Sequence, residues 1–177
     1  SIACYKAVDL ASKLTQAGAL VDVAMTAAAQ RFVSPLTFQA VTGRSVYTDM
    51  WQSDSVDGLP THIAHVGLAE DADIIAIIPA TAHTLARLAN GLADDLISVT
   101  ALAARCPLLV APAMDGSMYA HPAVRANIDT LSRRGAVVVP PDVGRFASGM
   151  VGEGRLPETR TLMGYIRRVL GQNGVLY

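Results

Sequence analysis

The sequence is short of lysine, aromatic residues and charge, and each shortage excludes a class of protein. Only 16% of its 177 residues are charged and 5% are aromatic, and Lys6 and Lys13 are the only lysines. The formal net charge is −1, from 14 basic and 15 acidic side chains. This leaves neither the basic stripe that binds a nucleic-acid backbone nor a polybasic patch for a membrane surface. We therefore expect no nucleic-acid partner and no membrane partner.

Cysteine is scarce as well. Cys4 and Cys106 are the only two, and neither belongs to a C-x-x-C pair, which excludes a disulfide framework and a thiolate metal site. His62 and His65 lie three residues apart without an H-E-x-x-H motif or a neighbouring carboxylate, so we expect no metal. The apolar runs are far shorter than the ~20 residues of a membrane span. With no signal peptide at the start, the sequence predicts a cytoplasmic protein.

Three common motifs are missing, and each absence removes a fold or a chemistry. The chain has no G-x-G-x-x-G, no P-loop and no G-x-S-x-G, so a standard dinucleotide site, a P-loop site and a nucleophile elbow are not supported. What the chain does have is a 51% share of apolar residues. That share is enough for a sizeable core in one α/β domain.

Helical and strand patterns alternate along the chain. Apolar residues at helical spacing predict helices, and short β-branched runs predict strands that are buried on both faces, as in a parallel sheet. The predicted strands are Leu20–Met25, Ile74–Ile78, Leu108–Ala111 and Val137–Val139. The predicted helices are one through Ala7 and Leu14 that Gly18 ends, Ala27–Phe32, Pro35–Val41, Val66–Asp73, Thr81–Ala89, Asp94–Ala104, His121–Arg134 and Thr161–Leu170. This alternation predicts the α/β class, with a single doubly wound, flavodoxin-like or Rossmann-like parallel sheet and helices on both faces.

Residues 1–170 are expected to form one domain. A doubly wound fold normally opens with a strand that leads into a phosphate-binding turn, so we expect a first strand before residue 1. Residues 171–177 resemble the start of a linker. Asp49–Pro60 has the densest turn chemistry and is predicted to be a loop.

Polar residues follow three of the predicted strands. Thr26, the segment Pro79–Thr84 and the segment Ala111–Gly116 stand at carboxyl ends of strands, where open α/β sheets bind ligands. With Ser1, these residues can cradle a phosphate and a flat ring. The alternative is that Thr81 and Thr84 only cap a helix. His65 has the same ambiguity, because it suits either a helix start or a general base.

A glycine-rich segment is the third candidate feature. Gly149, Gly152 and Gly154 precede Arg155 within Ala147–Glu158. Glycines at this density let a loop close over a ligand, although an ordinary surface loop has the same composition.

Several segments, taken in order, resemble the homo-oligomeric flavin-containing cysteine decarboxylases. The resemblance covers nearly the whole chain. It is carried by Ser1–Lys6, His65 eight residues before Asp73, Pro79–Thr84, Gly91–Leu96, Pro112–Asp115 and Gly149–Glu158. The most similar branch decarboxylates 4′-phosphopantothenoylcysteine to 4′-phosphopantetheine in coenzyme A synthesis and is fused to a C-terminal ligase.

The resemblance implies flavin mononucleotide (FMN) as cofactor, held between subunits of a homotrimer. The residues that it places at the flavin are Ser1, Thr26, Thr81, Ala82, His83, Thr84 and Ala113. His83 stands where asparagine is usual in the family, and an imidazole still offers one donor and one acceptor.

The resemblance also implies the chemistry. His65 matches the family's active-site histidine, whereas His62 does not. Oxidation at the carbon that bears sulfur creates a thiocarbonyl β to the carboxylate, carbon dioxide leaves, and the enethiolate is then reduced. The implied substrate-binding residues are Asp115, Met118, Gly149 and Arg155, and the implied catalytic residues are His65 and Ser148.

This sequence departs from the family pattern at two positions. Asp115 replaces an asparagine that holds the substrate carboxylate, so either Asp115 is protonated or another donor such as Arg155 takes over. Ser148 replaces a flap cysteine that assists the reductive half-reaction, and Cys4 and Cys106 are no obvious substitutes. Two alternatives remain open: an oxidative decarboxylase of a peptide C-terminal cysteine, and a non-enzymatic trimeric regulatory homologue.

Overall fold

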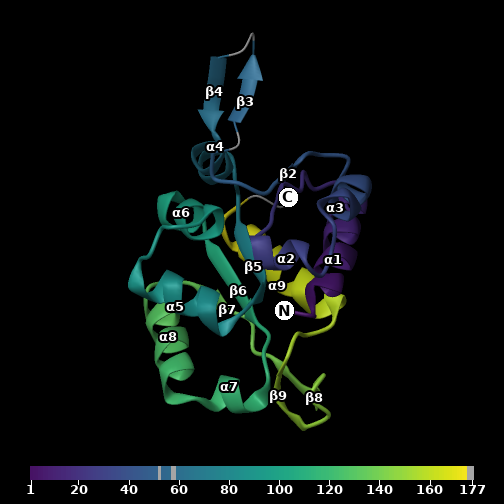
Figure 1. The fold of residues 1–177 in the computed structure, drawn as a ribbon, viewed down its shortest axis with the longest axis vertical. Helices are drawn as coiled ribbons and strands as arrows, with labels where there is room; N and C mark the ends of the chain where they lie inside the picture. The colour runs from purple at the N-terminus through teal and green to yellow at the C-terminus, as the bar shows by residue number, and fades with distance from the viewer. Residues whose placement is uncertain (52, 57–58, 175–177) are drawn as a thin grey trace.

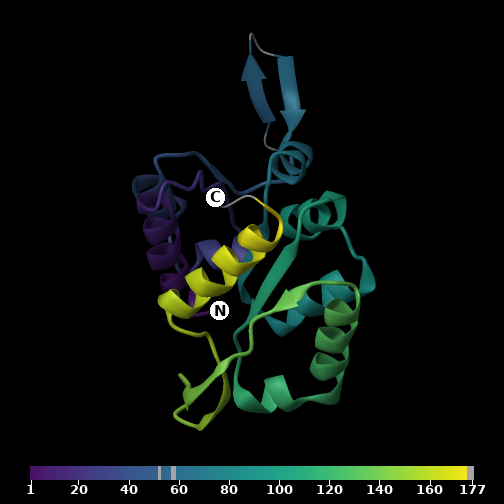
Figure 2. The same ribbon diagram turned by 180° about the vertical axis from the view of Figure 1, so that it is seen from behind.

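The computed structural model describes residues 1–51, 53–56 and 59–174. The helices are α1 (Cys4–Gln16), α2 (Ala27–Gln30), α3 (Pro35–Thr42), α4 (Ala64–Glu70), α5 (Ala82–Asn90), α6 (Leu96–Ala103), α7 (Gly116–Ala120), α8 (Pro122–Arg133) and α9 (Thr159–Gln172). The strands are β1 (Val23–Ala24), β2 (Val46–Tyr47), β3 (Ser53–Val56), β4 (Leu59–Ile63), β5 (Ile75–Ala80), β6 (Leu108–Pro112), β7 (Val137–Val138), β8 (Asp142–Arg145) and β9 (Val151–Arg155). Figures 1 and 2 show their arrangement from two opposite sides.

Parallel strands form the centre of the molecule, which confirms the predicted α/β class. Strands β5, β6 and β7 pair in that order, with Ile75 opposite Leu108 and Leu109 opposite Val137. Strands β1 and β2 form a second parallel pair that is not hydrogen-bonded to the first group. Each parallel step is connected through at least one helix, as such connections require.

Helices cover both faces of the three-stranded sheet (Figures 1 and 2). Successive side chains of a strand point to opposite faces, so Leu109 and Ala111 of β6 pack with α1 and α9, and Val110 packs with α5 and α8. Leu109, Val110 and Ala111 are all fully buried. This double burial explains why β6 is a continuous apolar run in the sequence.

Local signals set the ends of the helices as predicted. Gly43 and Gly91 end α3 and α5 in the left-handed conformation, where a residue without Cβ is favoured. Asp95 caps α6 in a capping box with Ser98. The guanidinium of Arg87 lies 2.6 Å from carboxylate oxygens of both Asp94 and Asp95. The Gly91–Leu96 segment therefore connects α5 to α6 and is held by helix caps and by the ion pairs of Arg87.

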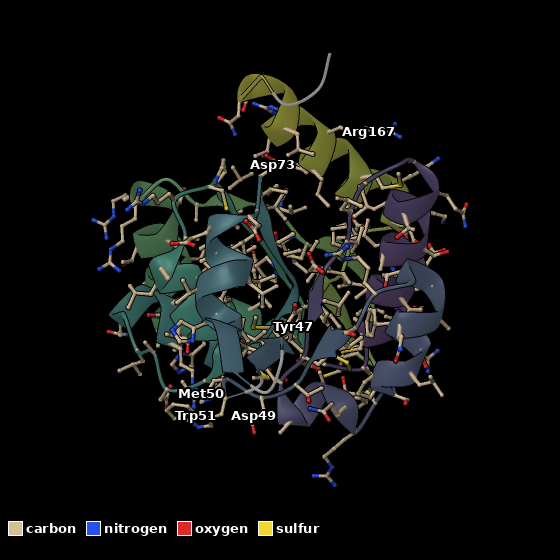
Figure 3. The ribbon with its side chains drawn as sticks, turned by 90° about the horizontal axis from the view of Figure 1, so that it is seen from above. Tyr47, Asp49, Met50, Trp51, Asp73 and Arg167 are labelled. Carbon is tan, nitrogen blue, oxygen red and sulfur yellow. The ribbon has the colours of Figure 1, made fainter. Side chains whose placement is uncertain are left out.

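Three segments differ from their predictions. The segment 49–60, predicted to be a loop, contains β3 and the start of β4, which pair antiparallel in a hairpin that projects from the body (Figure 1). Asp49, Met50 and Trp51 lie together at the edge where the chain leaves for this hairpin (Figure 3). The glycine-rich segment lies largely in a second antiparallel hairpin, β8–β9, and the short helix α7 was not predicted. Among the described residues, no helix is long and apolar enough to cross a membrane.

Candidate functional site

The segment after β5 builds the first wall of the site. Ala80 is fully buried at the end of β5, and its carbonyl oxygen accepts a hydrogen bond of 3.0 Å from the Ala113 N–H, beyond the end of β6. The Thr81 hydroxyl caps α5 by accepting from the Thr84 N–H at 3.3 Å and lies 3.1 Å from the Thr84 hydroxyl. The expected helix-capping role of Thr81 is thus present. It does not compete with ligand binding.

Helix α5 still offers donors to an anion. The first N–H groups of a helix have no intrahelical partner, and Thr81 satisfies that of Thr84 only. The N–H groups of Ala82 and His83 are therefore available at the carboxyl edge of the sheet, where the helix dipole also favours negative charge. This chemistry fits the phosphate or the polar ring edge of a flavin nucleotide.

Ser1 and Thr26 stand at two further helix starts. The Ser1 hydroxyl accepts from the Ala3 N–H at 3.4 Å just before α1, and Thr26 caps α2 through the Ala29 N–H at 3.1 Å. Both hydroxyls act as acceptors in these bonds, so their own protons remain available to a ligand oxygen. No hydrogen bond within the described part of the chain joins either residue to Thr81.

His65 is the second residue of α4, at the base of the β3–β4 hairpin (Figure 1). Its Nδ1 atom is buried and has no hydrogen-bond partner among the described residues. A buried polar atom without a partner is costly and calls for an explanation. A bound ligand or a neighbouring subunit would supply the missing partner, which suits a residue that handles a proton. His62 lies in β4, and its side chain is outside what the structure describes.

The β8–β9 hairpin, here called the flap (residues 142–155), docks against the segment between β6 and α7. The Met114 N–H donates to the Gly154 carbonyl oxygen at 2.9 Å, and the Phe146 ring packs beside Gly116 and Gly152. Gly154 has a φ of +144°, and a Cβ there would overlap the Met114 carbonyl oxygen. Gly154 therefore allows a close approach of two backbone segments that a residue with a Cβ would prevent.

At the flap tip, Ser148 meets Asp115. The Ser148 hydroxyl donates to Asp115 Oδ2 at 2.7 Å, while Oδ1 accepts from the Ser117 N–H at 3.1 Å and the Ser117 hydroxyl at 3.0 Å. These donors, Ser148 first, hold the pKa of the Asp115 carboxyl below its usual range. In this arrangement the three donors favour the ionised form of Asp115.

The base of the flap rests on a buried lysine that sequence reasoning missed. Lys6 of α1 is 6% exposed, and its Nζ donates to the Leu156 carbonyl oxygen at 2.9 Å and to Glu158 Oε1 at 2.8 Å. This contact lowers the pKa of Glu158. A lysine next to Ala7 on an otherwise apolar helix start was the available signal, since lysine is almost never buried unless it is paired.

The remaining predicted substrate residues are more dispersed. Gly149 sits in the flap tip with a φ of +87°, next to Ser148. Met118 of α7 is 49% exposed. Arg155 lies beside Gly144 and 3.7 Å from Glu158 at the base of the flap. The described structure thus brings Asp115, Ser148 and Gly149 together and leaves Arg155 near the opposite end of the hairpin.

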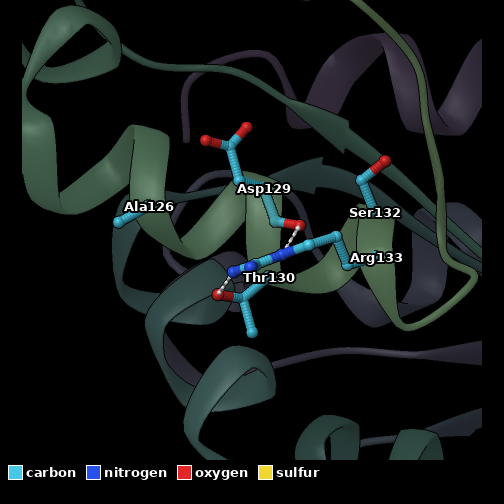
Figure 4. Close-up of a pocket in the computed structure, with 5 residues that line it drawn as sticks. All are labelled: Ala126, Asp129, Thr130, Ser132 and Arg133. Carbon is cyan, nitrogen blue, oxygen red and sulfur yellow. Dashed lines mark hydrogen bonds between the residues drawn. The ribbon is translucent and has the colours of Figure 1, made fainter.

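A hollow of about 470 Å³ lies on the surface of α8, lined by Ala126, Asp129, Thr130, Ser132 and Arg133 (Figure 4). The guanidinium of Arg133 donates to the Asp129 carbonyl oxygen and to the Thr130 hydroxyl of the same helix, each at 3.4 Å. Because no separate elements converge there, we place the candidate site at the strand ends instead. Among the described residues, no cluster of His, Cys, Asp and Glu could hold a metal ion.

Comparison with known proteins gives a consistent result. The family described as Flavoprotein matches residues 1–171. The chain is 49% identical over 162 residues to the Coenzyme A biosynthesis bifunctional protein CoaBC of Bacillus subtilis, which is 92% of this chain and 39% of that protein. It is 44% identical over 175 residues to CoaBC of Mycobacterium tuberculosis, 99% of this chain and 40% of that protein. The chain spans about two fifths of the length of these curated relatives.

Solved structures agree with the sequence relatives. A PPC decarboxylase with a cysteine-to-serine mutation, complexed with pantothenoylaminoethenethiol, has a TM-score of 0.82 and 30% identity, covering 95% of this chain and 92% of that one. The FMN-dependent cysteine decarboxylase SpaF has a TM-score of 0.79 and 31% identity, covering 97% and 91%. The fold of this chain is therefore the fold of FMN-dependent cysteine decarboxylases.

Proposed function

Because the chain belongs to the Flavoprotein family, we propose that it decarboxylates 4′-phosphopantothenoylcysteine to 4′-phosphopantetheine in coenzyme A synthesis, with FMN as cofactor. The observation that carries the proposal is the unpartnered, buried Nδ1 of His65, in a chain that closely resembles CoaBC over nearly its whole length. As in those relatives, a ligase domain is expected on the C-terminal side.

The residues at the strand ends suit FMN. The available N–H groups of Ala82 and His83, together with the hydroxyls of Ser1, Thr26 and Thr84, would hold its phosphate and ring edge. Ala113 lies at the same edge of the sheet, with its N–H bonded to the Ala80 carbonyl oxygen at 3.0 Å. When bound, FMN would supply reversible two-electron redox chemistry, which can oxidise the thiol-bearing carbon to a thiocarbonyl and so give the carboxylate of an N-acylated cysteine the electron sink that it lacks.

The protein itself supplies proton handling and exclusion of water. His65 would hold a proton at Nδ1 close to the reacting thiol or carboxylate, because a neutral imidazole has a lone pair or a proton to offer there. The flap would cover the substrate and keep water out. The Ser148 hydroxyl would contact the sulfur-bearing end, and Gly149 would let the tip approach it.

We also propose that the chain works as a homo-oligomer, as a trimer or a multiple of trimers. Several large apolar side chains are exposed: Phe32, just after α2, by 52%, Leu36 of α3 by 69% and Trp51 by 79%. Exposed apolar side chains of this size are typical of a protein–protein interface. A neighbouring subunit would cover them and complete the surroundings of His65.

The first experiment records the visible spectrum of the purified protein and then follows its reaction with 4′-phosphopantothenoylcysteine by mass spectrometry. We expect a yellow protein and a saturated product that is lighter by carbon dioxide alone. A yellow protein that releases no carbon dioxide would contradict the proposal.

His65→Asn tests the assigned base. This variant should keep its bound flavin and lose carbon dioxide release by at least about a hundredfold, the usual scale of a general acid–base contribution. The matched control is His121→Asn, at the start of α8, where the imidazole only caps a helix through the Ala123 N–H. Asparagine is an equally good cap, so this control should retain activity. Full activity in His65→Asn would refute the role.

One observation favours a second candidate, an oxidative decarboxylase of a peptide C-terminal cysteine. Ser148 is a far weaker acid than a thiol, and its proton is already donated to Asp115. In that case the product would be an enethiol, lighter by two further hydrogens, and a peptide ending in cysteine would react faster than 4′-phosphopantothenoylcysteine. The same mass measurement separates the two candidates.

A further inference from the structure

The contact between Asp115 and Ser148 links two elements that are otherwise held together by backbone and apolar contacts. Ser148 lies at the turn of the flap, and Asp115 is the N-cap residue just before α7, 33 residues earlier in the chain. Elsewhere the flap is docked by the Met114–Gly154 backbone bond and by the Phe146 ring. Among the described residues, the Ser148 hydroxyl is the tip's only side-chain hydrogen bond to α7.

The chemistry of the two side chains decides which is the donor in this contact and which is the acceptor. An ionised carboxylate can only accept, and a serine hydroxyl has one proton, so Ser148 is the donor. Oδ1 of Asp115 is used by Ser117 to cap α7, which leaves Oδ2 for the flap. A carboxylate has two oxygens, so Asp115 can accept from Ser117 and from Ser148 at the same time. A side chain with a single acceptor oxygen in one position cannot reach both donors.

The ion pairs of the flap do not hold its tip. The Arg125–Glu153 pair, 3.3 Å apart, joins α8 to the middle of the flap and is about half exposed on both sides, so it contributes little. Arg155 and Glu158 lie at the base. The position of the tip therefore depends on Asp115.

We propose that Asp115 is a positioning residue that holds the flap tip against α7 through the Ser148 hydroxyl. The flap's role over a bound substrate rests on the proposed function, but the docking itself does not. In this role Asp115 fixes the position of the flap. The substrate carboxylate would then be met by other donors and not by this side chain.

Limited proteolysis of the full chain with FMN bound measures the docking directly. Trypsin can cleave after Arg145, an exposed arginine within the flap, and a docked tip protects this bond. Asp115→Ala and Ser148→Ala should each raise the cleavage rate about fivefold, because cleavage follows the population of the open form. The double variant should also be cleaved about fivefold faster than the wild type, because each single change already removes the same contact. If the two side chains made independent contacts, their effects on the cleavage rate would multiply to about 25-fold.

Two further variants separate positioning from general loss of structure. Asp115→Asn should restore near wild-type protection, because its carbonyl can cap α7 while its amide N–H donates to the Ser148 oxygen. Ser117→Ala keeps the Asp115–Ser148 contact and should leave the cleavage rate unchanged. Cleavage after Arg168, in α9 between the buried Ile166 and Val169, requires that helix to unfold, so it reports on global unfolding and should not change in any variant.

Three results would overturn the proposal. These are wild-type cleavage in Asp115→Ala, multiplicative effects in the double variant, or an equal rise in cleavage after Arg168. None of them depends on turnover, so a chain that proved inactive toward 4′-phosphopantothenoylcysteine would refute the proposed function and leave this inference standing.

Discussion

The replacement of Gly154 by alanine tests how the flap docks onto the strand-end site. Gly154 has a φ of +144°, which lies outside the regions that residues with a Cβ adopt readily. The added Cβ would overlap the Met114 carbonyl oxygen and approach Phe146 Cε1 to 3.4 Å. The obstacle is a backbone oxygen whose own residue donates to the Gly154 carbonyl at 2.9 Å, so it cannot move away without loss of that bond.

The expected cost follows from these terms. Strain at a glycine-only backbone position costs about 1–3 kcal/mol, and loss of one backbone hydrogen bond adds about 1 kcal/mol. The sum is about 2–4 kcal/mol. The free energy of global unfolding need not fall by this amount, because the flap can undock while the core stays folded. We therefore expect a local effect: protection at Arg145 falls more than tenfold, while the free energy of global unfolding changes by less than about 1 kcal/mol.

Urea unfolding and tryptic cleavage after Arg145 measure the two parts separately. The matched control is Gly164→Ala in α9, where a Cβ meets nothing within 4 Å and φ is ordinary. Alanine should raise the free energy of unfolding there by about 0.5–1 kcal/mol. If Gly154→Ala kept wild-type flap protection, the close approach of Met114 and Gly154 would be refuted.

Three further predictions concern the core and the base of the flap. Lys6→Met should lower the free energy of unfolding by about 2 kcal/mol in urea titration, because the Leu156 carbonyl loses its donor and Glu158 its partner; an unchanged midpoint would contradict the buried pair. Since the pKa of Glu158 is lowered in the folded state, its stabilisation should be complete above the unfolded pKa of about 4.3 and be lost as pH falls through the folded pKa. Glu158→Gln should remove this part of the acid sensitivity, and a variant with the wild-type acid profile would refute it. Leu109→Ala, at a fully buried position, should cost about 2–5 kcal/mol in the same titration, and a loss under 1 kcal/mol would contradict the packing of β6.

The elements that could be predicted are those whose local signals agree with their burial. Strands β5 and β6 are covered on both faces, so they carry uninterrupted apolar runs. A strand with one face in water would instead alternate apolar and polar residues. Helix ends at Gly43 and Gly91 followed because their left-handed backbone favours glycine. In these segments propensity and tertiary structure point to the same answer.

The projecting hairpin could not be predicted for the opposite reason. Ser53, Asp54 and Ser55 prefer turns and have low strand propensity, yet they form β3 opposite β4. Backbone pairing with the partner strand overrides the local preference. Helix α7 is only five residues long and contains Gly116, so it lies below the length at which apolar periodicity can be recognised.

Within the site, sequence order located single residues but not their partners. Ser148 was expected to touch a ligand, and Asp115 was expected to be either protonated or replaced by another donor. Their mutual hydrogen bond spans 33 residues, and no spacing rule reaches that far. The state of Asp115 also depends on these partners, because three hydrogen bonds into one carboxylate stabilise its charged form.

The two ends of the flap are held in physically different ways, and this difference has a consequence for access to the site. At the base, the Lys6 amine is buried beneath Leu156, so separating it from its partners exposes a charge to a dry environment at high cost. At the tip, Asp115 and Ser148 are exposed, and water can replace their contact at little cost. The hairpin should therefore open by lifting its tip while its base stays in place. Because Lys6 and Ser1 belong to the same end of the chain, at the start of α1, the fixed base is also connected to the element that would hold the cofactor phosphate.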